Sequence, residues 1–335
     1  MGEWNRPFVG SEARAAGTAS ERALRTRHVM LYRNVYLPKH VPITAAIRAE
    51  AAWLWARREA TVAGLSAAAL HGSKWIDAEL PAELIRPVGC KVDGIRIHRD
   101  RLGDGEISVV GEIPVTTPAR TAYDLGRRDG LVQAVVRLDA LANATGLKPA
   151  GIVELLADHR GVRGLEQLRV AVDLMDGGAE SPQETRTRLL LTAAGFPRPR
   201  TQIVVCDEFG HFVGRVDMGW PDWKVGVEYD GPQHWASPAD HARTIERIAD
   251  LEDQGWTVVR VSRDMLRYRS GTLLARVRDA MRSAGWPDHA KVDLGCRLDR
   301  RWEAQSVGQP ATRPLRARRA GRTSRTTSCG TRRRA

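Results

Sequence analysis

The segment from Trp223 to Gly231 constrains this chain more than any other, because it predicts one β-strand with two chemically opposite faces. Side chains alternate across a strand. One face carries Val225, Val227 and Tyr229, and the other carries Lys224, Gly226, Glu228 and Asp230. The segment before it repeats the pattern, with Val216 and Met218 opposed to Arg215 and Asp217. Isolated buried charges are strongly disfavoured, so acids over an apolar face must meet water, positive charge or a metal.

The flanking residues predict the elements around this strand. Two antiparallel strands are expected over residues 202–206 and 212–218, joined by a turn at 207–211. Ser181, Pro182 and Glu184 form a helix start, in which serine accepts from a backbone amide and glutamate reaches back to the cap. The helix should continue through 185–194 and end at Gly195.

The three carboxylates Asp217, Glu228 and Asp230 are candidate ligands for a hard cation. Magnesium takes one or two carboxylates, keeps several waters and completes its shell with substrate phosphate. Such an ion can orient a water for in-line attack on a phosphodiester. The expected cofactor is therefore Mg²⁺, with Mn²⁺ as its substitute. On spacing alone the alternative is a sheet edge whose acids face solvent.

Three stretches carry a resemblance: "ESPQETRTRLLLTAAGFPRP", "GRVDMGWPDWKVGVEYDGPQHW" and "ERIADLEDQGWTVVRVSRDML". Over about residues 180–284 the chain resembles the actinobacterial domain-of-unknown-function family related to the very-short-patch-repair endonuclease, within the PD-(D/E)XK nuclease fold. The resemblance implies a helix, a mixed sheet of about four strands, and a second helix over 238–253 that leads into a strand over 257–261.

The same resemblance implies roles for single residues. Asp217 matches the aspartate of the second strand and Glu228 the acid of the third. Glu184, in preference to Glu180, matches the glutamate of the first helix. The ending "E-x-D-G-x-x-H" adds Asp230, Gln233 and His234.

One position departs from the wider fold, which has lysine two residues after the third-strand acid where this chain has Asp230. Lys224 is expected on the same face but four residues from Glu228, about 13 Å at ~3.3 Å per residue, which is too far to replace that lysine. His234 is the candidate proton carrier instead, because neutral imidazole accepts a proton near pH 7. For Glu184, helix capping and a supporting role at a metal remain equal alternatives.

Other residues near this segment have two interpretations each. Arg247 either approaches a phosphate or lies on a solvated helix face. Trp220, Trp223 and Trp256 are expected to pack in the core, and Trp235 is kept as a candidate for stacking on a base.

The N-terminal region carries a second resemblance, through "HVMLYRNVYLP", "LSAAALHG" and "GEIPVTTPARTAYDL". Over about residues 5–128 the chain resembles the N-terminal region of AbiEi-type antitoxins, the DNA-binding halves of type IV toxin–antitoxin pairs. Short helices near 11–16 and 20–26, strands within 29–38 and later helices at 45–58 and 66–72 fit a small winged helix.

The middle of the chain predicts strands at 83–88 and 94–99, a helix opened by Thr117-Pro118, and further helices between 130 and 175. Arg120 and Asp124 are four residues apart and are expected to form a surface ion pair, contributing only tenths of a kcal/mol. We place a domain boundary at Gly177-Gly178.

The net charge of +12 is concentrated in the last 32 residues, which hold nine arginines and no acid, so +3 remains for the rest. That tail is too poor in apolar residues to fold alone. It is either a phosphate-binding arm or an incidental extension, two equal alternatives. No apolar run approaches the ~18 residues of a membrane span, and the start has no signal-peptide core. The four cysteines form no close pair, which excludes a zinc pattern.

The expected fold class is α+β, with an N-terminal winged-helix-like region and a C-terminal restriction-endonuclease-like mixed sheet flanked by helices. The expected domains are a winged-helix-like region (1–75), an antitoxin-like region (76–178), an endonuclease-like domain (179–286) and a basic tail (287–335). The predicted function is a metal-dependent endonuclease that hydrolyses phosphodiester bonds in DNA. The alternative is an antitoxin-like DNA-binding transcriptional regulator with a non-cutting nuclease-like domain. We expect a cytoplasmic protein with DNA and a cognate toxin as partners, and no membrane.

Overall fold

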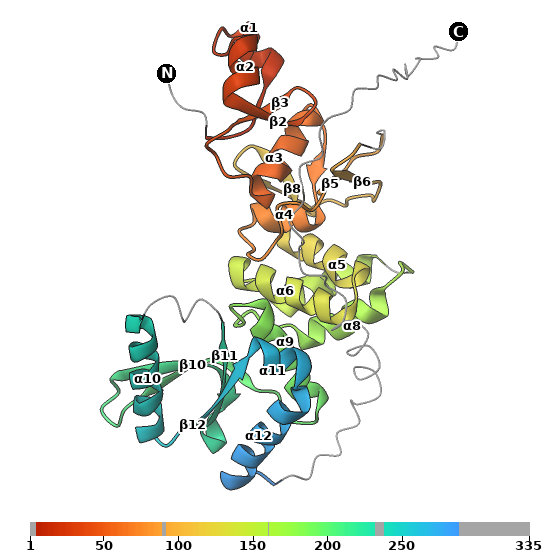
Figure 1. The fold of residues 1–335 in the computed structure, drawn as a ribbon. Helices are drawn as coiled ribbons and strands as arrows, with labels where there is room; N and C mark the ends of the chain where they lie inside the picture. Colours follow the sequence, from red (N-terminus) through yellow and green to blue (C-terminus); the bar gives the residue numbers. More distant parts are fainter. Residues whose placement is uncertain (1–4, 89–91, 160, 232–237, 288–335) are drawn as a thin grey trace.

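The computed structural model describes residues 5–88, 92–159, 161–231 and 238–287, with the backbone alone for 238–242. The described part is elongated (Figure 1). A small N-terminal unit, a five-stranded sheet with its helices, a group of helices and a four-stranded sheet follow one another along the molecule. The α+β class expected from the sequence is confirmed.

The N-terminal unit is a three-stranded antiparallel sheet with two short helices. Its elements are β1 (Phe8–Val9), α1 (Gly10–Ala15), α2 (Glu21–Arg27), β2 (His28–Tyr32) and β3 (Val35–Pro38), and the strand order is β1-β3-β2. Ser20 begins α2, its hydroxyl accepting a hydrogen bond from the amide of Ala23 at 3.2 Å. The expected strand stretch is thus a tight hairpin, with Asn34 at φ +64° in its turn.

A five-stranded mixed sheet follows, in the order β6-β5-β4-β8-β7. The elements are α3 (Ala45–Trp55), β4 (Thr61–Val62), α4 (Gly64–Leu70), β5 (Ala82–Ile85), β6 (Ile95–His98), β7 (Ile107–Val110) and β8 (Ile113–Thr116). Its core includes Trp53 and Leu84 together with Tyr32 and Val35 of the preceding hairpin. Because β4 pairs with strands on both sides, this sheet spans the expected boundary at 75/76.

Four helices pack beneath this sheet: α5 (Pro118–Arg128), α6 (Leu131–Thr145), α7 (Pro149–Asp158) and α8 (Leu165–Leu174). Thr117 caps α5, accepting from the amide of Arg120 at 3.3 Å, and proline occupies the first turn as expected. Leu138, Leu141 and Leu168 are fully buried in the core that joins these helices.

The ion pair expected at the surface of α5 is buried, so that prediction is wrong. Arg120 is 2% and Asp124 0% exposed, and the guanidinium donates to the carboxylate at 3.1 Å. Arg120 also donates to Glu106, and Asp124 accepts from Arg127 at 2.8 Å. The four-residue spacing predicted the contact but not the residues that cover it.

The C-terminal unit is a four-stranded sheet in the order β12-β11-β10-β9 with helices on both faces. The elements are α9 (Pro182–Ala193), β9 (Arg200–Cys206), β10 (Phe212–Trp220), the short 3₁₀ helix η1 (Pro221–Trp223), β11 (Val225–Asp230), α10 (Pro238–Asp253), β12 (Thr257–Ser262), α11 (Arg263–Tyr268) and α12 (Ser270–Ser283). Strands β11 and β12 are parallel and the other pairs antiparallel, as in the expected mixed sheet. Trp220 and Trp256 are buried, as predicted.

Helix α9 belongs to two cores at once. Leu189 packs with the α5–α8 helices, whereas Leu190 and Leu191 pack against the four-stranded sheet. Arg188, also on α9, pairs with Asp139 of α6 at 2.7 Å, and both side chains are 1% exposed. The helix therefore continues the packing across the boundary that we placed at Gly177-Gly178.

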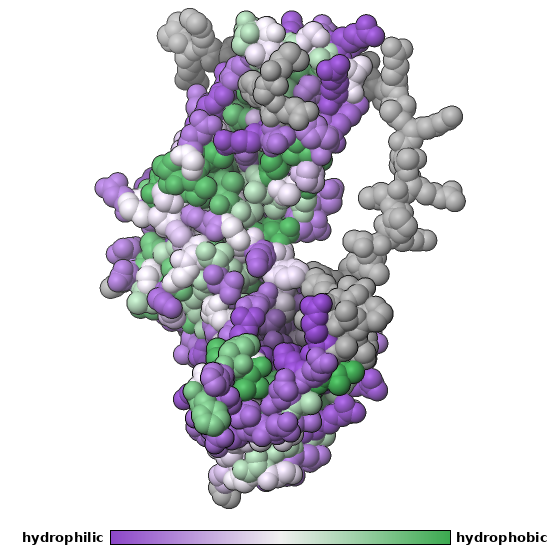
Figure 2. Space-filling view, turned by 90° about the vertical axis from the view of Figure 1, so that its left-hand side faces the viewer, coloured by the Kyte–Doolittle hydropathy of each residue, from purple (hydrophilic) through white to green (hydrophobic). Residues whose placement is uncertain are grey.

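The surface carries no continuous apolar belt on the face shown in Figure 2, where apolar patches alternate with hydrophilic ones. Within the described residues, every helix is too short or too polar to cross a bilayer.

Candidate functional site

The site lies where β10 and β11 separate. Their pairing runs from Trp220 opposite Val225 to Met218 opposite Val227. One residue further, the carboxylate of Asp217 accepts the amide hydrogen of Tyr229 at 2.8 Å in place of a backbone carbonyl. The acid therefore bridges the point at which the ladder opens.

Two glycines bring the strands together just before this opening. Gly219 faces Gly226 across the ladder. A Cβ atom on Gly219 would lie 2.2 Å from the carbonyl oxygen of Val225, so no larger residue fits. Backbones that approach so closely fix the position of Asp217 relative to the next strand.

Glu228 is 7% exposed and is neutralised by Arg247 of α10. The guanidinium donates to both carboxylate oxygens, at 2.6 and 2.8 Å, and one of its nitrogens also donates to the carbonyl of Arg215 at 3.2 Å. Two parallel charge-assisted hydrogen bonds are among the strong ones in proteins. Arg247 therefore does not lie on a freely solvated helix face, and its expected contact with a phosphate stays a prediction.

Of the two roles that the sequence left open for Glu184, the structure shows helix capping. Ser181 caps α9 as predicted, accepting from the amide of Glu184 at 3.2 Å. The carboxylate reaches one residue beyond the expected cap, to the amide of Glu180 at 2.8 Å, and accepts from the side chain of Gln202 at 3.3 Å. Burial raises the pKa of Glu184. Its charge is also felt by Asp217.

Within this cluster, Asp217 is the acid whose pKa is shifted most. Burial, followed by the charge of Glu184, raises its pKa to about 7, against the partial compensation of the Tyr229 amide and Arg247. Glu228 raises it further. Glu184 and Glu228 are thus close enough to oppose the ionisation of Asp217. Among the described residues, however, no three acid, histidine or cysteine side chains converge as a set of metal ligands.

Gln202 is the residue that the sequence did not indicate. It lies on β9 between the partners of Val216 and Met218, hence beside Asp217, and its backbone adopts φ +51°. Its amide nitrogen binds Glu184, while its side-chain oxygen is buried without a hydrogen-bond partner among the described groups. An unsatisfied buried oxygen costs about 1–3 kcal/mol, which suits a group that waits for a donor or a cation.

The remaining predicted site residues lie apart from this cluster. Asp230 pairs with Arg260 of β12. Lys224 is outside the strand, in a left-handed conformation at φ +49°, and its ammonium group donates to the carbonyl of Gln254 at 2.9 Å. The expectation that Lys224 shares the strand face of Glu228 is therefore wrong. Gln233, His234 and Trp235 lie outside the described residues.

Comparison with known proteins places the chain in a family. No described family model matches it. Over 195 residues it is 33% identical to uncharacterized protein MT2308 of Mycobacterium tuberculosis strain CDC 1551 / Oshkosh, covering 57% of this chain and 71% of that protein. The same values hold for uncharacterized protein Rv2248 of strain ATCC 25618 / H37Rv. The chain belongs to the family of these two mycobacterial proteins. The names of these family members state no activity, so function has to be argued from the site.

Proposed function

We propose that the C-terminal unit is a metal-dependent DNA endonuclease and that the N-terminal unit directs it to DNA. The observation that carries the proposal is Asp217, a carboxylate at the opening between two strands whose pKa is raised to about 7 by burial and neighbouring acids. Strongly perturbed acids are concentrated at functional sites. The resemblance to the very-short-patch-repair-like family supports the same residue and the same fold.

The donor set suits a hard divalent cation. Mg²⁺ is held by one or two carboxylates together with water and substrate phosphate, so a full set of protein ligands is not needed. Asp217 and Glu228 would hold the ion, with Glu184 adding negative charge nearby. When bound, Mg²⁺ supplies a Lewis acid that polarises the scissile phosphodiester. The orphan oxygen of Gln202 supports this assignment, because it adds acceptor capacity at the same place.

Arg247 gives the site its positive charge. Its guanidinium fork binds Glu228 through both terminal nitrogens, and its side chain is 34% exposed. The same fork matches the geometry of a phosphate. We propose that Arg247 neutralises Glu228 and orients the phosphodiester, and that His234 carries the proton.

The N-terminal unit supports DNA as the partner. The succession β1-α1-α2-β2-β3, in which the hairpin β2–β3 completes the sheet, is compatible with the expected winged helix and so supports this proposal. Helix α2 exposes Arg22, Arg25 and Arg27 to solvent. Exposed arginines release counterions from nucleic acid and so favour binding. A cognate toxin remains a proposed partner on the resemblance to AbiEi-type antitoxins.

A second candidate is a DNA-binding transcriptional regulator that no longer cuts. It is favoured by the pairing of Glu228, both of whose oxygens bind Arg247, and by Asp230 at the position of the expected lysine. A carboxylate whose charge is already neutralised by arginine attracts a metal ion less strongly.

A cleavage assay separates the two candidates. Supercoiled plasmid and single-stranded DNA are incubated with the full chain in Mg²⁺ or Mn²⁺. The native chain should cut and Asp217→Ala should not, whereas Asp222→Ala, which removes an exposed acid from η1 at the closed end of the β10–β11 hairpin, should cut normally. DNA binding without any cleavage in either metal would refute the endonuclease and support the regulator.

A further inference from the structure

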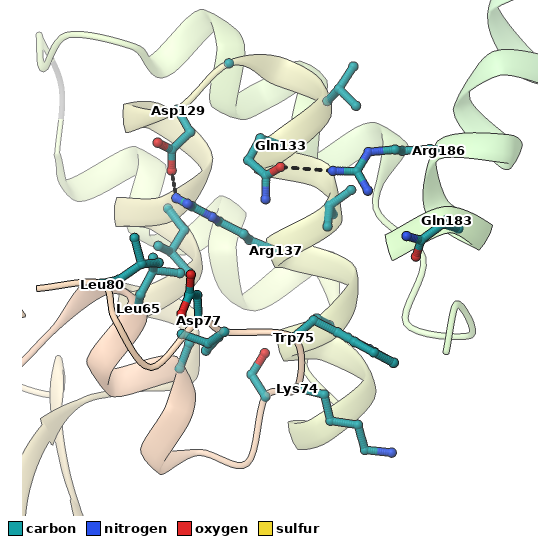
Figure 3. A pocket seen from close by; sticks show the side chains of 18 of the residues that line it. Leu65, Lys74, Trp75, Asp77, Leu80, Asp129, Gln133, Arg137, Gln183 and Arg186 are labelled. Carbon is teal, nitrogen blue, oxygen red and sulfur yellow. Dashed lines mark hydrogen bonds and ion pairs between the residues drawn. The ribbon is translucent and has the colours of Figure 1, made fainter. Parts of the chain in front are cut away.

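A cleft opens between the helical group and the four-stranded sheet, on the side of β11 that carries the side chain of Tyr229. Its volume is about 710 Å³, and its walls come from the loop after α4, from α6, from the start of α9 and from α11. Figure 3 shows Gln133 of α6 and Arg186 of α9 pointing toward one another in this cleft. A hollow of this size accommodates a small organic ligand.

The charge of the cleft is positive. Five basic side chains line it against two acids, and the basic ones are Lys74, Arg137, Arg186, Arg263 and Arg267. One of the acids, Asp129, is already paired with Arg137 (Figure 3). The lining therefore offers several cations to an anion that enters it.

Arg186 is half-buried and is bonded to a neutral side chain. It donates to the side-chain oxygen of Gln133 at 3.2 Å, and no ion pair with a carboxylate of the described residues accompanies that bond. Burial lowers the pKa of Arg186, the sign of a cation without sufficient counter-charge. Arginines that lose part of their hydration normally find a carboxylate or a phosphate, since desolvating a lone charge is costly.

Aromatic side chains complete the lining. Trp75 is 54% exposed and its backbone has φ +65°, a conformation that bulky residues rarely adopt. The ring nitrogen donates to the carbonyl of Glu180 at 3.2 Å, which holds the indole while leaving much of its surface open. Tyr229 also lines the cleft. Exposed aromatic faces beside cations are the usual means of binding a nucleobase next to its phosphate.

We propose that this cleft binds a nucleoside phosphate unit, with the phosphate at Arg186 and Arg263 and the base on Trp75. The unit is either a free nucleotide or an unpaired nucleotide of a nucleic-acid strand, which share this chemistry. The site is distinct from the Asp217 cluster and does not require the chain to cut DNA.

Calorimetric titration of the full chain in a chelating buffer tests the proposal without any cleavage step. The probes are inorganic phosphate, deoxyadenosine, deoxyadenosine 5′-monophosphate and a single-stranded decathymidylate. The nucleotide should bind more tightly than phosphate or nucleoside alone. Arg186→Gln and Arg263→Gln should each weaken nucleotide binding by about tenfold or more, the usual effect of losing a charged hydrogen bond. Because Arg263 is exposed, its variant keeps the test decisive if Arg186→Gln fails to fold.

The aromatic variant separates the two halves of the ligand. Trp75→Ala should weaken nucleotide binding by about fivefold to a hundredfold and leave inorganic phosphate unchanged. Arg169→Gln on α8 and Phe209→Ala in the β9–β10 turn remove one exposed charge and one exposed ring elsewhere, and should change neither affinity.

Competition identifies the source of the nucleotide. A decathymidylate that binds more tightly than the nucleotide and displaces it indicates a strand, whereas a nucleotide that the decamer does not displace indicates a free ligand. If the nucleotide does not bind at millimolar concentration, or binds all variants equally, the cleft is not a nucleotide site. Failure of the endonuclease proposal would leave each of these results unaffected.

Discussion

Replacing Asp217 by asparagine should stabilise the folded protein at neutral and alkaline pH. In the native chain the carboxylate is buried beside Glu184 and Glu228, and its pKa rises from 3.8 to about 7. The folded state then holds a proton that the unfolded state has lost, so unfolding becomes easier as the pH rises from about 4 to about 7. Asparagine cannot ionise, and its side-chain oxygen can still accept the amide of Tyr229.

The size of the stabilisation by Asp217→Asn follows from the shift in the pKa of Asp217. About three pKa units at 1.36 kcal/mol each give an upper limit of roughly 4 kcal/mol above pH 7. Solvent that reaches this half-buried side chain reduces the figure, so we expect about 2–4 kcal/mol. At roughly 2–4 °C per kcal/mol, the melting temperature should rise by at least ~4 °C.

Thermal melts in chelator at several pH values provide the measurement. The stability difference between Asp217→Asn and the native chain should be small near pH 4, grow with pH, and level off above pH 7. Asp222→Asn, at an exposed position on η1, is the control and should show no such growth. A variant that melts at or below the native temperature across this range would refute the electrostatic account of the site.

Three other outcomes are expected. If Mg²⁺ binds with a dissociation constant of ~1 mM, 10 mM should stabilise the native chain by about 1.4 kcal/mol in thermal melts, but not Asp217→Asn. Arg188→Met should cost about 3–5 kcal/mol in urea denaturation by leaving Asp139 buried and unpaired, and the double change to Arg188→Met with Asp139→Leu should recover part of it. Gly164→Ala should lower the melting temperature more than Gly161→Ala, because both have positive φ but only the first places a Cβ atom 2.3 Å from a backbone oxygen.

Local rules predicted most of the C-terminal unit. The start of α9 at Ser181-Pro182, the β9–β10 hairpin and the alternation in β11 depend on neighbouring residues alone, and the structure contains all three. The expected strand face failed at Lys224, because η1 ends there and the chain turns before β11 begins. Period-two patterns do not show where a strand starts when the turn before it contains ordinary residues.

The candidate site was predictable in part. Asp217 and Glu228 followed from the acids on two adjacent strands, whereas Gln202 did not. Counting back from the hairpin turn places Thr201 opposite Asp217, but the irregularity between Phe212 and Gly214 shifts the register by one residue. The contact of Arg247 with Glu228 had one usable signal: Arg247 is four residues before the buried Leu251 and therefore lies on the same side of α10. The sequence contained no signal for the burial of Arg120, because the residues that cover this side chain are distant from it in the sequence.

The sharing of α9 between two cores bears on how this protein can be divided or recombined. The helix carries Glu184 of the acid cluster, Arg186 of the cleft and Arg188 of the pair with Asp139 within two turns. A fragment that begins at α9 would expose Leu189 and a buried arginine to water, and one that ends before it would leave Asp139 unpaired. The four-stranded sheet is therefore not an exchangeable module. A cut just upstream of α5 would likewise separate buried Arg120 from Glu106, so the five-stranded sheet, the helices and the four-stranded sheet should be transferred together.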